Sequence, residues 1–101
     1  MGLKQAEQSD IKQILDGNGI IYKHSPRCGM SASRKEVVEK LAEDTDIFLI
    51  DVLGQRDLSN HIAEELDLKH ESPQLIGVEN GEAVWHKNHM AITEEAVSEH
   101  I

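Results

Sequence analysis

The feature that most constrains this chain is a nearly continuous apolar run at positions 47–53, Ile-Phe-Leu-Ile-Asp-Val-Leu. A strand with one face in water alternates apolar and polar residues, whereas a strand covered on both faces is apolar throughout. The run therefore predicts a central strand with helices packed on both faces of its sheet. The chain has 101 residues, which is enough for one such domain and not for two.

A second apolar segment, Ile20-Ile21-Tyr22, precedes that run and is rich in residues that favour strands. Between the two segments, apolar residues recur at three- and four-residue spacing, which predicts a helix that ends near Glu43. A strand, a helix and a strand at these lengths form a β-α-β unit, and its two strands should be parallel.

Helical patterns also flank this unit. Ser9 is predicted to cap a first helix that Gly17 ends as a left-handed cap. A third helix is predicted from four-residue apolar spacing and begins near Asp57 or Ser59. Thr93 is predicted to be the N-cap of a last helix, because Glu94 and Glu95 follow it in the first turn.

A hairpin precedes the last helix. Asn80-Gly81 predicts a tight turn between strands at 74–78 and 83–86. The complete order is helix, β-α-β, helix, β-hairpin and helix, which is a thioredoxin-like layout. We expect a four-stranded mixed sheet in the strand order 2-1-3-4 with helices on both faces, formed by residues 1–101 as a single thioredoxin-like domain.

The only cysteine, Cys28, falls where the first strand passes into the next helix. Unpaired backbone N–H groups and the helix dipole favour an anion at that place, so we expect a nucleophilic thiolate. Arg27, Lys23 and His24 are close in sequence and would add positive potential. Gly29 allows close approach of another backbone. A lone cysteine is more often buried and inert, but the helix-start position and the polar flanks favour a reactive one.

Ser31 stands three positions after Cys28, where a C-x-x-C enzyme has its second thiol. Because the chain has no other cysteine, a second small thiol or another reductant from outside must release Cys28 from any mixed disulfide. Ser31 is expected to donate a hydrogen bond to the thiolate.

A proline at the entry of the third core strand is a further feature of the thioredoxin-like layout, and Ser72-Pro73 is found at that place. We expect the Ser72 backbone to pair with an extended substrate chain. The sequence leaves the cis or trans state of the Ser72–Pro73 bond open.

Two sequence blocks carry a family resemblance: Lys23-His24-Ser25 with Cys28-Gly29-Met30-Ser31, and Lys69-His70-Glu71-Ser72-Pro73-Gln74. They resemble the monothiol bacilliredoxins, the YtxJ-like proteins of the bacillithiol system, and the likeness extends from about Ser9 onward. It implies a thioredoxin-like fold and an enzyme that removes a low-molecular-weight thiol from protein mixed disulfides. The implied partners are thiolated client proteins and the small thiol, bacillithiol, as co-substrate, with no tightly bound cofactor.

Two other functions stay open. The segment Pro26–Ser31 also looks like the C-G-F-S signature of monothiol glutaredoxins, which can share an iron–sulfur cluster between two protomers. A thioredoxin-fold binding module without chemistry is the other alternative. His86 and His89 have a plausible ligand spacing, but we expect no dedicated metal site. His70 is interpreted as a surface or capping histidine.

The charge and the lack of long apolar stretches limit partners and location. The formal net charge is −9, from 19 acidic and 10 basic residues, which disfavours nucleic acid and anionic membranes. No apolar stretch approaches the roughly 20 residues of a membrane span, and the first residues lack the apolar core of a signal peptide. A single cysteine excludes an internal disulfide. We therefore expect a cytoplasmic protein.

Overall fold

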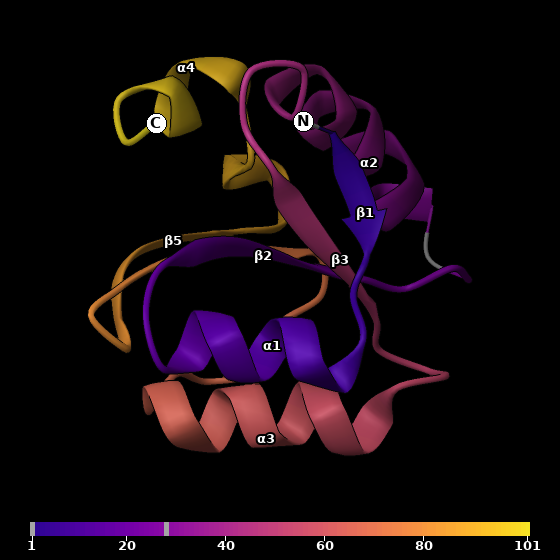
Figure 1. Cartoon of the computed structure of the whole chain (residues 1–101). Coiled ribbons are helices and arrows are strands. Elements are labelled where there is room, and N and C mark those ends of the chain that lie inside the picture. Colours follow the sequence, from indigo (N-terminus) through magenta and orange to yellow (C-terminus); the bar gives the residue numbers. More distant parts are fainter. Residues whose placement is uncertain (1, 28) are drawn as a thin grey trace.

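The computed structural model describes residues 2–27 and 29–101. In Figure 1, α1 and α3 cover one face of the sheet, and α2 and α4 cover the other, as the apolar run at 47–53 predicts. The elements in chain order are β1 (Leu3–Gln5), α1 (Gln8–Leu15), β2 (Gly19–His24), α2 (Gly29–Leu41), β3 (Ile47–Asp51), α3 (Arg56–Leu66), β4 (Gln74–Glu79), β5 (Glu82–Asn88), the 3-10 turn η1 (His89–Ala91) and α4 (Glu94–Ser98).

The described sheet has five strands in the order β1-β3-β2-β4-β5. β2 and β3 are parallel, as the β-α-β unit predicts, while β4 is antiparallel to both β2 and β5. The expected order 2-1-3-4 of the predicted strands is present as β3-β2-β4-β5, but the expectation of four strands is wrong, because β1 adds a parallel edge strand beside β3. β1 has three residues, Leu-Lys-Gln, which is too short for an apolar alternation to mark it as a strand.

Each face of the sheet has its own apolar core. Ile50 packs with residues of α1 and α3, whereas Ile47 and Leu49 pack with residues of α2 and α4. Along β2, Ile21 and Tyr22 alternate between the two cores in the same way. This alternation decides on which face each side chain near the end of β2 lies.

The helix ends differ from prediction at α1 and agree at α4. Glu7, not Ser9, is the N-cap of α1, and its N–H donates to Asp10 Oδ2 at 2.9 Å. At the other end, α1 is followed by Asp16 in right-handed conformation, so Gly17 is not a left-handed cap. Thr93 is confirmed as the N-cap of α4, because its hydroxyl accepts from the Ala96 N–H at 3.1 Å.

The predicted hairpin is confirmed. Asn80 and Gly81 have φ angles of 52° and 75°, and they connect the antiparallel pair β4 and β5. Both positive angles belong to the tight turn that the Asn-Gly pair favours. Within the two described ranges, the helices fall short of the length and apolarity that a bilayer crossing requires.

Candidate active site

The predicted strand-to-helix connection is present around position 28. β2 ends at His24 and α2 begins at Gly29, while Cys28 itself lies outside the described residues. Arg27 and Gly29, on either side of it, are exposed. A β-carbon built on Gly29 would meet no atom within 4 Å, so another chain has room to approach the backbone there.

Ser31 anchors the first turn of α2 to β2. Its side chain is fully buried, and its Oγ accepts the Ser25 N–H at 3.3 Å. Its carbonyl oxygen accepts a hydrogen bond from the Tyr22 hydroxyl at 2.9 Å. Because Oγ is an acceptor toward Ser25, that bond leaves the hydroxyl proton available. Donation from Ser31 to the Cys28 sulfur stays a prediction.

The proline loop lies at the same edge of the sheet as the end of β2. Lys23 pairs with Gln74 across β2 and β4, so Ser72 and Pro73 lie beside the strand end that leads to Cys28. The Ser72–Pro73 peptide bond is cis, and Pro73 is buried. In the described part of the chain, Ser72 Oγ is buried without a hydrogen-bond partner. Pairing of its backbone with a substrate stays a prediction.

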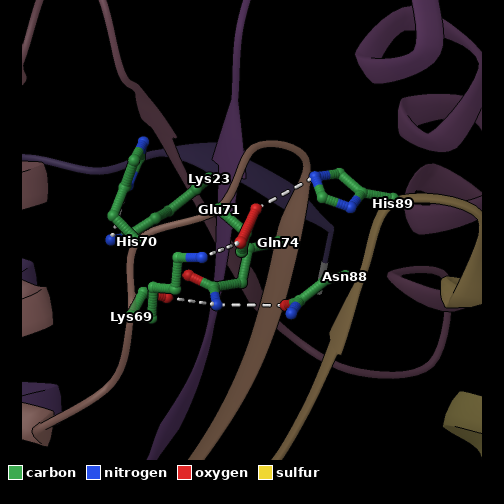
Figure 2. Close-up of polar contacts among 7 residues, drawn as sticks. All are labelled: Lys23, Lys69, His70, Glu71, Gln74, Asn88 and His89. Atoms are coloured by element: carbon green, nitrogen blue, oxygen red, sulfur yellow. Dashed lines mark hydrogen bonds and ion pairs between the residues drawn. The ribbon is translucent and has the colours of Figure 1, made fainter.

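Lys23 is completely buried beneath this loop. Its Nζ donates to the Ser59 carbonyl oxygen at 3.1 Å and lies 3.2 Å from His70 Nδ1. Figure 2 shows Lys23 reaching His70, which lies in the loop that leads to Pro73. Burial lowers the pKa of Lys23 from 10.5 to about 8. Lys23 therefore joins β2, α3 and the proline loop through neutral partners.

His24 lies on the opposite face of the sheet, because successive residues of a strand alternate. Its Nδ1 is 3.5 Å from the Tyr22 hydroxyl, in the layer that α2 covers. Burial and the charge of Lys35 lower its pKa, while Asp51 acts in the other direction. Lys23 and His24, which we expected to act together on the thiol, thus approach this edge from opposite faces.

His70 and Ser59 are site residues that the sequence reasoning missed. The interpretation of His70 as a surface or capping histidine is incomplete, because its ring contacts both the buried Lys23 amine and, at 3.4 Å, Ser59 Oγ. The available signal was a lysine directly after Ile20-Ile21-Tyr22: a charge within an apolar strand requires polar partners from elsewhere in the chain.

A second polar group holds the proline loop against β5 (Figure 2). Glu71 forms an ion pair with Lys69 at 3.6 Å, and its other carboxylate oxygen lies 3.2 Å from His89 Nε2. Gln74 Nε2 donates to the Lys69 carbonyl oxygen at 3.1 Å and to Asn88 Oδ1 at 3.0 Å. Among residues 2–27 and 29–101, no three histidine or acidic side chains gather as metal ligands would.

Comparison with solved structures defines the class of protein. The fold is similar to that of thioredoxin from Aeropyrum pernix, with a TM-score of 0.71 and 17% identity over 93% of this chain and 80% of that one. It is also similar to oxidised thioredoxin O1 from Arabidopsis thaliana, with a TM-score of 0.71 and 12% identity over 98% and 97% of the two chains. At such identities the likeness shows the fold alone, and the molecule is a thioredoxin-fold protein.

Two further matches define the family. A solved protein described as a candidate oxidoreductase with a thioredoxin fold is 31% identical, with a TM-score of 0.85 over 96% of this chain and 90% of that one. The family model described as monothiol bacilliredoxin BrxC matches residues 3–97. The chain therefore belongs to the monothiol bacilliredoxin family, within the thioredoxin-like oxidoreductase fold.

Proposed function

We propose that this protein is a monothiol thiol–disulfide oxidoreductase that removes a low-molecular-weight thiol, bacillithiol, from protein mixed disulfides through Cys28. The observation that carries the proposal is the meeting of two segments at one sheet edge. The strand that leads to Cys28 and the cis Ser72–Pro73 loop lie side by side there, in a chain of the monothiol bacilliredoxin family.

The reaction consists of two exchange steps. The Cys28 thiolate attacks the small thiol's sulfur in the mixed disulfide, so that a new S–S bond forms and the client cysteine leaves as a thiolate that takes up a proton. A second small thiol, as its thiolate, then attacks the sulfur bound to Cys28. This step releases the Cys28 thiolate and a symmetric disulfide of the small thiol. The small thiol taken from the client and the second small thiol thus supply together the two electrons that reduce the mixed disulfide.

The residues around Cys28 have separate parts in this proposal. The exposed backbone at Gly29 and the Ser72 backbone would bind the client or the small thiol, beside the exposed Arg27. Ser31 would stabilise the thiolate and, as a hydroxyl, cannot resolve the mixed disulfide. The proposal includes a cytoplasmic location, which the presence of a single cysteine supports.

Intact-protein mass spectrometry tests the proposal. The protein is incubated with a model client that carries bacillithiol on one cysteine, and both masses are followed. We expect Cys28 to gain the adduct while the client loses it, and a second equivalent of bacillithiol to release it. Cys28→Ser and Cys28→Ala should both abolish the transfer. Transfer that persists in either variant would contradict the proposal.

Anaerobic purification separates this function from the alternative of an iron–sulfur carrier. The proposed enzyme should be a colourless protein that transfers the adduct. A brown dimer that loses its colour in Cys28→Ser and transfers no adduct would favour the alternative. A thiol whose alkylation shows a pKa at or above about 8.5, the ordinary cysteine value, would favour the binding module without chemistry.

A further inference from the structure

A small polar groove opens beside the proline loop. It has a volume of about 300 Å³ and is lined by Val52, Leu53, Arg56, Ser59, Asn60 and His70. These residues come from the end of β3, the first turns of α3 and the loop before Pro73. The lining contains the donors of Arg56, Asn60 and His70 and no acidic side chain.

The buried Lys23 decides which nitrogen of His70 carries the proton. A lysine ammonium has only donors, so His70 Nδ1, 3.2 Å from it, must be the acceptor. A neutral imidazole that accepts at Nδ1 carries its proton on Nε2. The exposed ring of His70 therefore presents a second donor, away from Lys23.

The nearby carboxylates are occupied elsewhere. Glu71, the acidic neighbour of His70, is engaged by Lys69 and His89. Asp51 Oδ1 accepts the N–H groups of Leu53 at 2.9 Å and Gly54 at 3.2 Å. Among the described residues, no ion pair joins either carboxylate to Arg56 or His70. Burial has the larger effect on His70 and lowers its pKa, although the charge of Glu71 still acts on that ring and raises the pKa.

Asp57 lies in the first turn of α3, beside Arg56. It lines a separate hollow of about 580 Å³, which Arg56 also borders but His70 does not. The combination of Arg56 with His70 and Asn60 is therefore particular to the smaller groove. Three donor side chains without an acidic partner suit a planar anion, because guanidinium and imidazole groups form charge-assisted hydrogen bonds with carboxylate oxygens.

The groove lies between the two segments of the candidate active site. The Val52 N–H donates to the His24 carbonyl oxygen at 2.9 Å, and His24 is the last residue of β2 before the turn to Cys28. At its other side, His70 precedes the cis Ser72–Pro73 bond by two residues. We propose that this groove binds a carboxylate group of the small thiol and so selects thiols that carry one. This inference rests on the proposed function.

A kinetic test compares three small thiols of similar size on the same client cysteine: mercaptopropionate, mercaptoethanol and cysteamine, which are negative, neutral and positive. We expect the adduct to move to Cys28 about tenfold faster from the mercaptopropionate disulfide than from the mercaptoethanol one, the effect of one charge-assisted contact. Arg56→Gln should reduce the ratio of these two rates toward one. Lys12→Gln removes an equal charge from the exposed face of α1 and should leave the ratio unchanged.

A binding test needs no chemistry at Cys28. Succinate is titrated into the Cys28→Ser protein while the imidazole signals of His70 are followed by NMR. We expect a saturable shift that Arg56→Gln weakens about tenfold and Lys12→Gln does not change. Equal transfer rates for the three thiols would overturn the proposal that the groove binds a carboxylate, and so would a Lys12→Gln variant that loses the rate preference as fully as Arg56→Gln does. Either result would leave the proposed function intact. If no disulfide transfers its adduct, the proposed function fails and the titration alone decides the groove.

Discussion

At the scale of single residues, Lys23 combines complete burial with a charge that meets only neutral partners, the Ser59 carbonyl and His70. Its pKa of about 8 in the folded protein, against 10.5 for an unburied lysine, means that burial disfavours the charged form. At pH values below both pKa values, a shift of this size lowers the free energy of unfolding by roughly 3 kcal/mol. A buried charge that lowers stability is typical of positions retained for function or for specific structure.

The stability cost of Lys23 predicts a particular pH dependence. Between about pH 8 and 10.5 the unfolded chain holds the Lys23 proton and the folded one does not, so the free energy of unfolding rises with pH in that window. Lys23→Met removes this contribution. The free energies of unfolding of both proteins are measured by urea denaturation. As the pH rises through this window, we expect the value for Lys23→Met minus the value for wild type to fall by roughly 3 kcal/mol. Because other groups titrate equally in both proteins, a constant difference would contradict the assigned burial of the charge.

Ser31 provides a prediction about where its side chain faces. Ser31→Cys places a thiol in the first turn of α2, three residues after Cys28, which is the spacing of a C-x-x-C pair. We expect mild oxidation to form an internal disulfide, seen as two lost thiols and a mass lower by two hydrogens. Ser33→Cys, exposed two positions further on, is the matched control and should keep both thiols. Two free thiols in Ser31→Cys would mean that position 31 does not face the sulfur.

The sequence identifies single residues well where local chemistry decides and poorly where distant contacts decide. Ser31 and Pro73 were located by counting from Cys28 and from the strand order. The partners of Lys23 were not, because Ser59 and His70 are 36 and 47 residues away from it. Lys23 and His24 were both expected to add positive potential at the thiol because they are close to it in sequence, although strand alternation puts them on opposite faces of the sheet.

At the scale of elements, a strong periodic pattern or turn sequence was sufficient to predict a strand or a hairpin, whereas a weak one was not. Asn80-Gly81 identified the β4–β5 hairpin, and the apolar run at 47–53 identified the strand covered on both faces. β1 gave no signal, because its three residues form an edge strand whose partner, β3, is more than 40 positions away. Only tertiary pairing makes that segment a strand.

The β4–β5 pair yields a prediction at this scale. Gly77 lies opposite Trp85, and a β-carbon on Gly77 would collide with the indole ring. Gly77→Ala should therefore displace Trp85 from its stacked position on His100, where the ring centroids are 5.0 Å apart. We expect a loss of about 1–3 kcal/mol in the free energy of unfolding. Since the chain has one tryptophan, its fluorescence should shift in the native state.

Gly29→Ala is the matched control for this prediction. A β-carbon at Gly29 enters open space at the beginning of α2, so its free energy of unfolding should stay equal or rise slightly, because alanine favours a helix more than glycine does. The native tryptophan fluorescence should not change. Equal destabilisation of both variants would show that the indole of Trp85 does not determine the need for glycine at position 77.

At the scale of the whole molecule, the two-faced core followed from one apolar strand, but the connections between distant parts did not. A sequence pattern would treat Gln55 as a loop residue, but its side chain contacts residues from distant segments of the chain. Its Nε2 donates to the Ala6 carbonyl oxygen at 2.8 Å, and its Oε1 accepts from the Asp51 N–H at 3.0 Å and from Gln5 Nε2 at 2.7 Å. The end of β1 is thereby tied to the end of β3 and to the first turn of α3, which carries Arg56.

This connection predicts that a change far from Cys28 affects the groove. Gln55→Ala leaves the Ala6 carbonyl and the Asp51 N–H without their partner, which should lower the free energy of unfolding by about 1–3 kcal/mol in urea denaturation. Because Arg56 follows Gln55 directly, succinate affinity should fall as well. Gln13→Ala, on the exposed face of α1, should change neither quantity. Lower stability with unchanged succinate affinity would mean that α3 holds Arg56 in place without help from β1.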